Sequence, residues 1–191
     1  MSTRPITILG IPGSLREHSF NKALIRAASE VAPDGIAVHT FLLHDIPLYN
    51  ADVEAQGNPE PVRELKQAIA NADGVLFSTP QYNRSVSGVL KNAVDWASRP
   101  AFESVLAGKP VAIIGATSGK SATEAARADL LKILQSTRSA VMDTQTIGIS
   151  NSGDYIDAGI VESEEVKHQI RRLLEDFAVF IRGHALAEAA D

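Results

Sequence analysis

The chain has 191 residues, 45% of them hydrophobic and 21% charged, so it is long enough to bury its own core, and one domain over residues 1–191 is expected. The formal net charge is -5 and no Lys/Arg-rich stripe is available to neutralise phosphates, which argues against nucleic acid as a partner. There is no cysteine, so disulfides, thiolate metal sites and thiol nucleophiles are excluded, and any redox chemistry must use a cofactor.

The N-terminal segment predicts neither export nor membrane insertion. Residues 1–5 lead directly into a short apolar run that is too brief for the core of a signal peptide, and no apolar run reaches the length that spans a bilayer. The expected location is therefore the cytoplasm.

Short β-branched runs bounded by Gly or Pro alternate with longer stretches of helical apolar periodicity along the whole chain. Five strands are predicted, at Ile6 to Ile11, Ala37 to Leu43, Gly74 to Ser78, Pro110 to Gly115 and Ala140 to Ile147. Five helices are predicted, at Asn21 to Ala32, Pro61 to Asn71, Gly88 to Trp96, Thr123 to Ser136 and Glu164 to Gly183. The polar stretches Tyr49 to Pro61 and Ser150 to Ser163 are predicted to be surface loops.

This alternation is typical of βαβ units, which join parallel strands by right-handed crossovers. It predicts an α/β fold of the flavodoxin-like type, a three-layer α/β/α sandwich around a five-stranded parallel sheet of order 2-1-3-4-5. Ligands of such folds bind outside the carboxyl ends of the strands. Three loops are therefore candidates for a site, at Pro12 to Phe20, Thr79 to Ser87 and Ala116 to Ala122.

The first loop has the residues that a phosphomonoester requires. Gly13 permits close backbone approach, Arg16 offers a forked cation, and hydroxyl and amide groups together with free N–H groups precede the next helix. This loop contains neither a GxGxxG fingerprint nor the Gly-Lys-Ser/Thr of a triphosphate loop, which favours a mononucleotide. The alternative is an ordinary turn in which Ser19 caps the helix and Arg16 is solvated.

The second loop suits a flat heterocycle. Pro80 stiffens the exit from the third strand, while Gln81, Tyr82 and Asn83 combine an aromatic wall with groups that donate and accept in the plane of a ring. The alternative is a turn in which Asn83 caps locally and Tyr82 packs. The apolar residues of the following helix, among them Trp96, are expected to form core.

The third loop is rich in glycine and hydroxyl groups and leads into a helix. Its backbone N–H groups, near Ser118 and Gly119, could face the electron-rich edge of a ring and stabilise negative charge there. The run Gly119-Lys120-Ser121 lacks the first glycine of a phosphate loop at the required offset, so that motif is rejected.

With these segments in view, the chain resembles the NADPH-dependent FMN reductase family, which includes chromate-reducing and quinone-reducing flavoproteins. The resemblance rests on Gly13 to Arg16 with Ser19 to Asn21, on Pro80 to Asn83 with Gly88 to Trp96, and on Gly115 to Gly119. It implies a cofactor-binding set of Gly13, Ser14, Leu15, Arg16, Ser19, Phe20, Asn21, Pro80, Gln81, Tyr82, Asn83, Ser118 and Gly119.

The resemblance further implies FMN held without a covalent bond, hydride transfer from NADPH or NADH, and a small electron acceptor such as a quinone, with chromate, azo dyes and free flavins as other candidates. It also implies a homodimer or homotetramer. The flavin performs this chemistry, so no catalytic side chain is nominated, and the five histidines show no metal-ligand spacing. Two other functions stay open at this point: a flavodoxin-type electron carrier and a flavin-free partner-binding module.

The sequence departs from the family pattern in three places. Gln81 stands where a glutamate is usual, Ser87 stands where proline is usual, and Ser121 to Glu124 replaces a stretch that is richer in glycine. The loss of a carboxylate at position 81 removes a possible ion-pair partner between subunits. Ser87 loosens the loop but offers a helix N-cap in exchange.

Overall fold

The computed structural model describes residues 4–101, 103–142 and 146–188. One six-stranded parallel sheet contains β1 (Ile6–Pro12), β2 (Ile36–Thr40), β3 (Gly74–Ser78), β4 (Pro110–Ala116), β5 (Ala140–Val141) and β6 (Ile147–Ile149). The order β2-β1-β3-β4-β5 confirms the predicted 2-1-3-4-5 arrangement, and β6 also pairs with β4.

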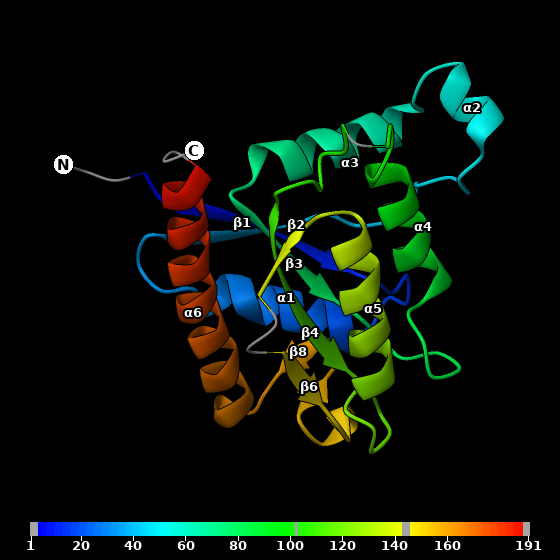
Figure 1. The fold of residues 1–191 in the computed structure, drawn as a ribbon. Helices are drawn as coiled ribbons and strands as arrows, with labels where there is room; N and C mark the ends of the chain where they lie inside the picture. Colours follow the sequence, from blue (N-terminus) through cyan, green and yellow to red (C-terminus); the bar gives the residue numbers. More distant parts are fainter. Residues whose placement is uncertain (1–3, 102, 143–145, 189–191) are drawn as a thin grey trace.

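Helices cover both faces of the sheet. They are α1 (Phe20–Glu30), α2 (Ala51–Ala55), α3 (Glu60–Asn71), α4 (Gly88–Ala97), α5 (Glu124–Ser136) and α6 (Glu164–Glu188). Figure 1 shows α1 and α6 on one face and α3, α4 and α5 on the other, with the sheet between the two groups. The three-layer sandwich expected from the sequence is therefore confirmed.

The central strands are buried on both sides, which explains why they read as continuous apolar runs. On β4, Ala112 and Ile114 pack with α1 and α6, whereas Val111 and Ile113 pack on the opposite face with α3, α4 and α5. A glycine on β1 allows α1 to approach closely, since a Cβ atom at Gly10 would clash with Cγ2 of Ile25.

Two predicted strands differ from the observed ones. The second strand ends at Thr40 and not at Leu43, because the pairing of β1 with β2 ends at Gly10 and Thr40. The fifth, predicted as Ala140 to Ile147, consists of β5 and β6, which pair with opposite ends of β4. Residues 143–145 lie outside the described residues.

Both stretches predicted as surface loops contain regular structure. The first holds α2, which begins where the Asn50 side chain accepts a hydrogen bond from the N–H of Asp52 at 2.8 Å. The second holds a 3-10 turn, η1 (Ser152–Asp154), and the antiparallel pair β7 (Ile156–Asp157) and β8 (Ile160–Val161). Ile156 and Val161 are buried in the core beside α1 and α6, and this burial holds the β7–β8 pair against the rest of the fold.

Candidate functional site

A pocket of about 250 Å³ lies at the carboxyl ends of the central strands, between the three candidate loops. It is lined by Ser14, Arg16, Ser19, Phe20, Asn21, Pro80, Gln81, Tyr82, Ala116, Thr117 and Ser118. The pocket thus brings together most of the residues nominated from the sequence. Gly13, Leu15, Asn83 and Gly119 do not line it.

The first loop is tied to the second by backbone and side-chain bonds. The Gly13 N–H donates to the carbonyl of Ser78 at 2.8 Å, and the buried Ser87 hydroxyl donates to the carbonyl of Gly13 at 2.6 Å. A Cβ atom at Gly13 would lie 2.9 Å from Cδ2 of Leu90 on α4. Gly13 is therefore needed for packing against α4, whereas the sequence had suggested close approach to a ligand.

Free donors remain on the rest of the first loop. The Arg16 side chain is exposed and forms no hydrogen bond or ion pair with the described residues. The backbone N–H groups of Ser14, Leu15, Glu17 and His18 likewise donate to no acceptor among the described residues. A guanidinium beside unpaired N–H groups at a helix start is a donor set that fits a phosphomonoester.

The carbonyl of Leu15 is contacted by one side chain from α1 and by one from the segment after β2. Lys22 Nζ donates to it at 3.1 Å, and His44 Nε2 lies 3.1 Å from the same oxygen. These contacts fix the peptide that precedes Arg16. Neither residue was singled out from the sequence, because nothing in the spacing links position 44 to this loop.

Ser19 and Asn21 have local partners. Ser19 is the N-cap of α1 and accepts from the N–H groups of Asn21 and Lys22, which was the alternative offered for it from the sequence. The Asn21 amide is buried: its nitrogen donates to the carbonyl of Ala116, while its oxygen accepts from the N–H of Ala116 and the hydroxyl of Ser78. Asn21 therefore joins the end of the first loop to the starts of the second and third loops, and it also lines the pocket.

The second loop forms a tight turn at its centre. Tyr82 and Ser85 exchange backbone hydrogen bonds of 3.1 and 3.0 Å, and Asn83 and Arg84 between them have positive φ values of 50° and 64°. Asn83 is exposed at the tip, so its side chain does not reach the pocket. Tyr82 is 48% exposed and lines the pocket, where its ring offers an aromatic face.

Ser87 performs the capping role that was expected of it. Its side chain accepts from the N–H of Leu90 and so caps α4, in addition to donating to the carbonyl of Gly13. One buried hydroxyl thus starts α4 and fastens it to the first loop. The bond to Gly13 could not be foreseen, because it joins residues 74 positions apart.

The third loop is braced by the segment after β6. The N–H groups of Asn151 and Ser152 donate to the carbonyls of Gly119 and Thr117, and the Thr117 N–H donates to the carbonyl of Ile149. Thr117, which the sequence did not nominate, lines the pocket directly after β4. Its position at the carboxyl end of a strand was the signal that could have identified it.

Arg127 on α5 holds the third loop to β6. Its guanidinium donates to the carbonyls of Ala122 and Thr146, each at 3.2 Å, and contacts the Thr146 hydroxyl. Burial lowers the pKa of Arg127, and the nearby Glu124 carboxylate partly opposes that shift. The side chain stays charged at neutral pH, because an arginine begins from a very high pKa.

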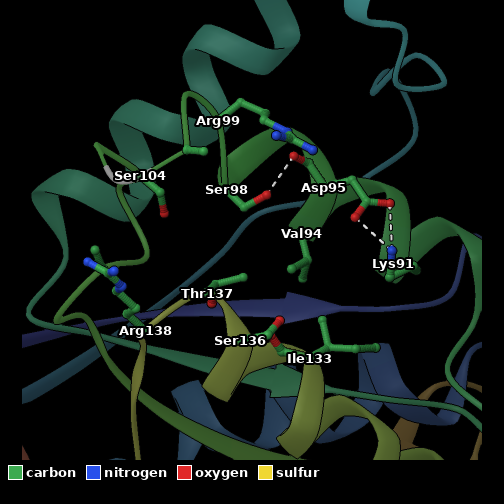
Figure 2. A pocket seen from close by; sticks show the side chains of 12 residues that line it. Lys91, Val94, Asp95, Ser98, Arg99, Ser104, Ile133, Ser136, Thr137 and Arg138 are labelled. Carbon is green, nitrogen blue, oxygen red and sulfur yellow. Dashed lines mark hydrogen bonds and ion pairs between the residues drawn. The ribbon is translucent and has the colours of Figure 1, made fainter.

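A second cavity, of about 320 Å³, lies at the far ends of α4 and α5 (Figure 2). Figure 2 shows Lys91 paired with Asp95, and Ser98 donating to the carbonyl of Asp95. This cavity shares no lining residue with the first pocket. It is therefore separate from the candidate site.

The first pocket has room and chemistry for a phosphate next to a flat ring. Free donors that suit a phosphate lie on the first loop, Pro80 and Tyr82 provide apolar and aromatic walls, and Ser118 lines the pocket from the third loop. In residues 4–101, 103–142 and 146–188 no group of three or more His, Cys, Asp or Glu could hold a metal ion. Over the same residues, no helix has the length and apolarity needed to cross a bilayer.

Comparison with known proteins gives consistent matches. Residues 6–154 match the family described as NADPH-dependent FMN reductase. An NAD(P)H-dependent FMN reductase of Pseudomonas aeruginosa is 38% identical over 178 residues, covering 93% of this chain and 96% of the relative. A 2-hydroxy-1,4-benzoquinone reductase of Burkholderia sp is 39% identical over the same length, covering 93% of this chain and 97% of the relative. The structure of FerB, a flavoenzyme NAD(P)H:(acceptor) oxidoreductase of Paracoccus denitrificans, superposes with a TM-score of 0.81 at 34% identity, covering 94% and 98% of the two chains.

Proposed function

The chain belongs to the NADPH-dependent FMN reductase family, and from this premise we propose that it is an FMN-dependent NAD(P)H oxidoreductase that reduces a small acceptor such as a quinone. The observation that carries the proposal is the pocket between three loops, where an unpaired guanidinium and free N–H groups lie beside an aromatic wall. An electron carrier would use the same cofactor, but the relatives are named as reductases.

The first loop would hold the FMN phosphate. Arg16 supplies a forked cation, Ser14 a hydroxyl, and Leu15 and neighbouring residues backbone N–H groups. Phe20 and Ser19 line the same end of the pocket. The remaining nominated residues of this loop, Gly13 and Asn21, keep the loop in place and do not contact the phosphate.

The second and third loops would hold the ring. Pro80 and Tyr82 give it an apolar and aromatic wall, and the backbone at Ser118 offers a donor to its polar edge. Gly119 would act by shaping the turn, because its N–H donates to the Thr117 hydroxyl at 3.2 Å. Gln81 and Asn83 contribute through the backbone, because the amide of Gln81 bonds to α5 and Asn83 lies at the exposed tip.

The chemistry that FMN would supply here, held by the first loop and by the wall of Pro80 and Tyr82, is two-electron transfer from a nicotinamide to the acceptor. The chain's own residues bind and orient the reactants, and none is required as an acid, base or nucleophile. Tyr82 lines the space that the nicotinamide and the acceptor would occupy one after the other. A quinone is proposed because a relative is named for that reaction, with chromate, azo dyes and free flavins as further candidates.

The assembly and location expected from the sequence belong to the same proposal. We propose a homodimer or homotetramer in the cytoplasm, formed by a single FMN-binding domain over residues 1–191. Light scattering of the purified protein measures the assembly. A monomeric mass would remove that part of the proposal and leave the chemistry untouched.

The decisive experiment mixes the FMN-loaded protein with NADPH, and separately with NADH, in the absence of oxygen. Loss of the oxidised-flavin absorbance, followed by its return when a benzoquinone is added, is the expected result. An electron carrier would keep its absorbance under both nicotinamides. A protein that takes up no FMN would support a partner-binding module.

A further inference from the structure

The turn Tyr82–Ser85, here called the tyrosine hairpin, is not favoured by its own sequence. Its two central residues, Asn83 and Arg84, both have left-handed backbone conformations, with φ of 50° and 64°. Two-residue hairpin turns of this kind prefer Asn followed by Gly, because glycine adopts the left-handed conformation without strain. With arginine in the second position, the hairpin needs support from elsewhere.

The side chain before the hairpin is bonded to the start of α5. The Gln81 amide oxygen accepts from the N–H groups of Ala125 and Ala126 at 3.1 and 3.3 Å, and its nitrogen donates to the hydroxyl of Ser121 at 2.9 Å. The residue at the N-cap position, Thr123, makes no capping bond. Gln81 therefore caps α5 from another loop.

The last residue of the hairpin is bonded to the same helix. The Ser85 hydroxyl donates to the Asp129 carboxylate at 2.8 Å. Lys132 Nζ lies 3.7 Å from the other oxygen of that carboxylate. Both sides of the hairpin are thus fastened to α5, one at its first turn and one a turn later.

We propose that Asp129 and Gln81 are positioning residues that hold the tyrosine hairpin as a fixed wall, so that α5 determines where the Tyr82 ring stands over the flavin and its acceptor. The proposal rests on the proposed function, since it assigns the ring of Tyr82 to that site. Tyr82 lines the pocket and makes no side-chain hydrogen bond to the described residues. If the hairpin is already fixed before binding, no conformational entropy of the hairpin is lost when the flavin or a flat acceptor binds.

The test is a double-mutant cycle with Ser85→Ala, Asp129→Ala and the double variant. FMN affinity of the apoprotein is measured by flavin fluorescence, and KM and kcat are measured for a benzoquinone. Each single variant should weaken FMN binding or raise the quinone KM about 3- to 10-fold, the scale of one lost hydrogen bond, with kcat little changed. The double variant should lose no more than a single one, because both remove the same bond.

Two further variants separate positioning from a general loss of stability. Asp129→Asn should restore most of the affinity, because its amide oxygen still accepts from the Ser85 hydroxyl. Lys132→Ala removes the 3.7 Å ion pair and leaves the hairpin bond intact, so wild-type affinity is expected. Additive losses in the cycle, or equal losses in Lys132→Ala, would overturn the proposal.

The outcome can be told apart from a failure of the proposed function. If the wild-type protein binds FMN and is reduced by NADPH but the Ser85 and Asp129 variants match it, the positioning role is wrong and the function stands. If the wild-type protein binds no FMN, amide hydrogen exchange still tests the tether. Faster exchange at the Ser85 N–H in Asp129→Ala supports it, and unchanged exchange rejects it.

Discussion

Under the proposed function, Arg16 is the residue expected to contribute most to binding of the FMN phosphate. It is exposed at the pocket and has no partner among the described residues, so all the N–H donors of its guanidinium are available to a ligand. Arg16→Ala should weaken FMN binding by about 1.5 to 3 kcal/mol, the scale of a hydrogen bond to a charged group. Fluorescence titration of the apoprotein with FMN measures the change.

Riboflavin, which lacks the phosphate, is the matched ligand for this experiment. Arg16→Ala should leave riboflavin affinity unchanged and so reduce the preference for FMN. Arg182→Ala, on the exposed side of α6, should change neither affinity. An equal loss for both ligands would mean that Arg16 supports the fold of the loop and does not contact the phosphate.

Ser87 is a residue of the site with a predicted effect on stability. Its buried hydroxyl caps α4 and donates to the carbonyl of Gly13. Ser87→Ala should lower the free energy of unfolding by about 1 to 2 kcal/mol, because it removes a cap and leaves a buried carbonyl unpaired. Urea unfolding followed by circular dichroism measures this, with Ser136→Ala as control, since the exposed Ser136 hydroxyl bonds only to its own helix.

At the scale of residues, sequence reasoning predicted positions better than contacts. Arg16 and Tyr82 line the pocket as expected, because each lies in a loop at the carboxyl end of a central strand. Asn21 and Gln81 line it too, yet their amides bond to protein groups far away in the chain. An amide has the same chemistry whether it faces a ligand or a neighbouring loop, so only tertiary structure separates the two.

At the scale of elements, β1 and β3 are joined at their amino ends by Asp73. Its carboxylate accepts from the Arg4 guanidinium at 2.9 Å and from the Thr7 N–H at 2.8 Å. Partial burial acts to raise the pKa of Asp73, but the hydrogen bonds from Arg4 and Thr7 outweigh it, and the pKa lies below its usual value. Asp73 therefore stabilises the folded chain in its charged form.

The direction of the pH dependence follows. A carboxylate with a lowered pKa contributes stability above the unfolded-state value of about 3.9, and this contribution is lost as the pH falls through the lower folded-state value. Asp73→Asn should lower the free energy of unfolding by about 1 kcal/mol at neutral pH. The difference between wild type and variant should shrink below about pH 4 in urea unfolding. Asp34→Asn, at an exposed position, should show no such trend, and a constant gap for Asp73→Asn would contradict the assignment.

The elements that sequence reasoning predicted well are those with strong local signals. The buried strands β3 and β4 and the amphipathic helices α3 and α5 were found within about one residue, because apolar periodicity and Gly or Pro boundaries mark them. The end of the edge strand β2 and the split between β5 and β6 were not predicted. Their limits depend on which residues of β1 and β4 are available for pairing, and a single segment carries no information about that.

At the scale of the whole molecule, the site is a junction of distant parts of the chain. Asn21 links α1 to β3 and β4, Ser87 links α4 to the first loop, and Gln81 links the second loop to α5. Figure 1 shows these elements on both faces of the sheet. A ligand that contacts all three loops must therefore favour the folded state as a whole.

This coupling predicts that FMN stabilises the entire fold. At a free FMN concentration 100 times its dissociation constant, the free energy of unfolding should rise by about 2.7 kcal/mol. For a chain of this size that corresponds to an increase in Tm of about 5 to 10 °C, measured by far-UV circular dichroism. Fluorescence of Trp96, the single tryptophan, gives a second probe, because its buried indole donates to the carbonyl of Pro47 at 2.8 Å. The same FMN concentration should raise the Tm of Arg16→Ala less, whereas equal shifts in both proteins would show that the stabilising ligand is not held by its phosphate.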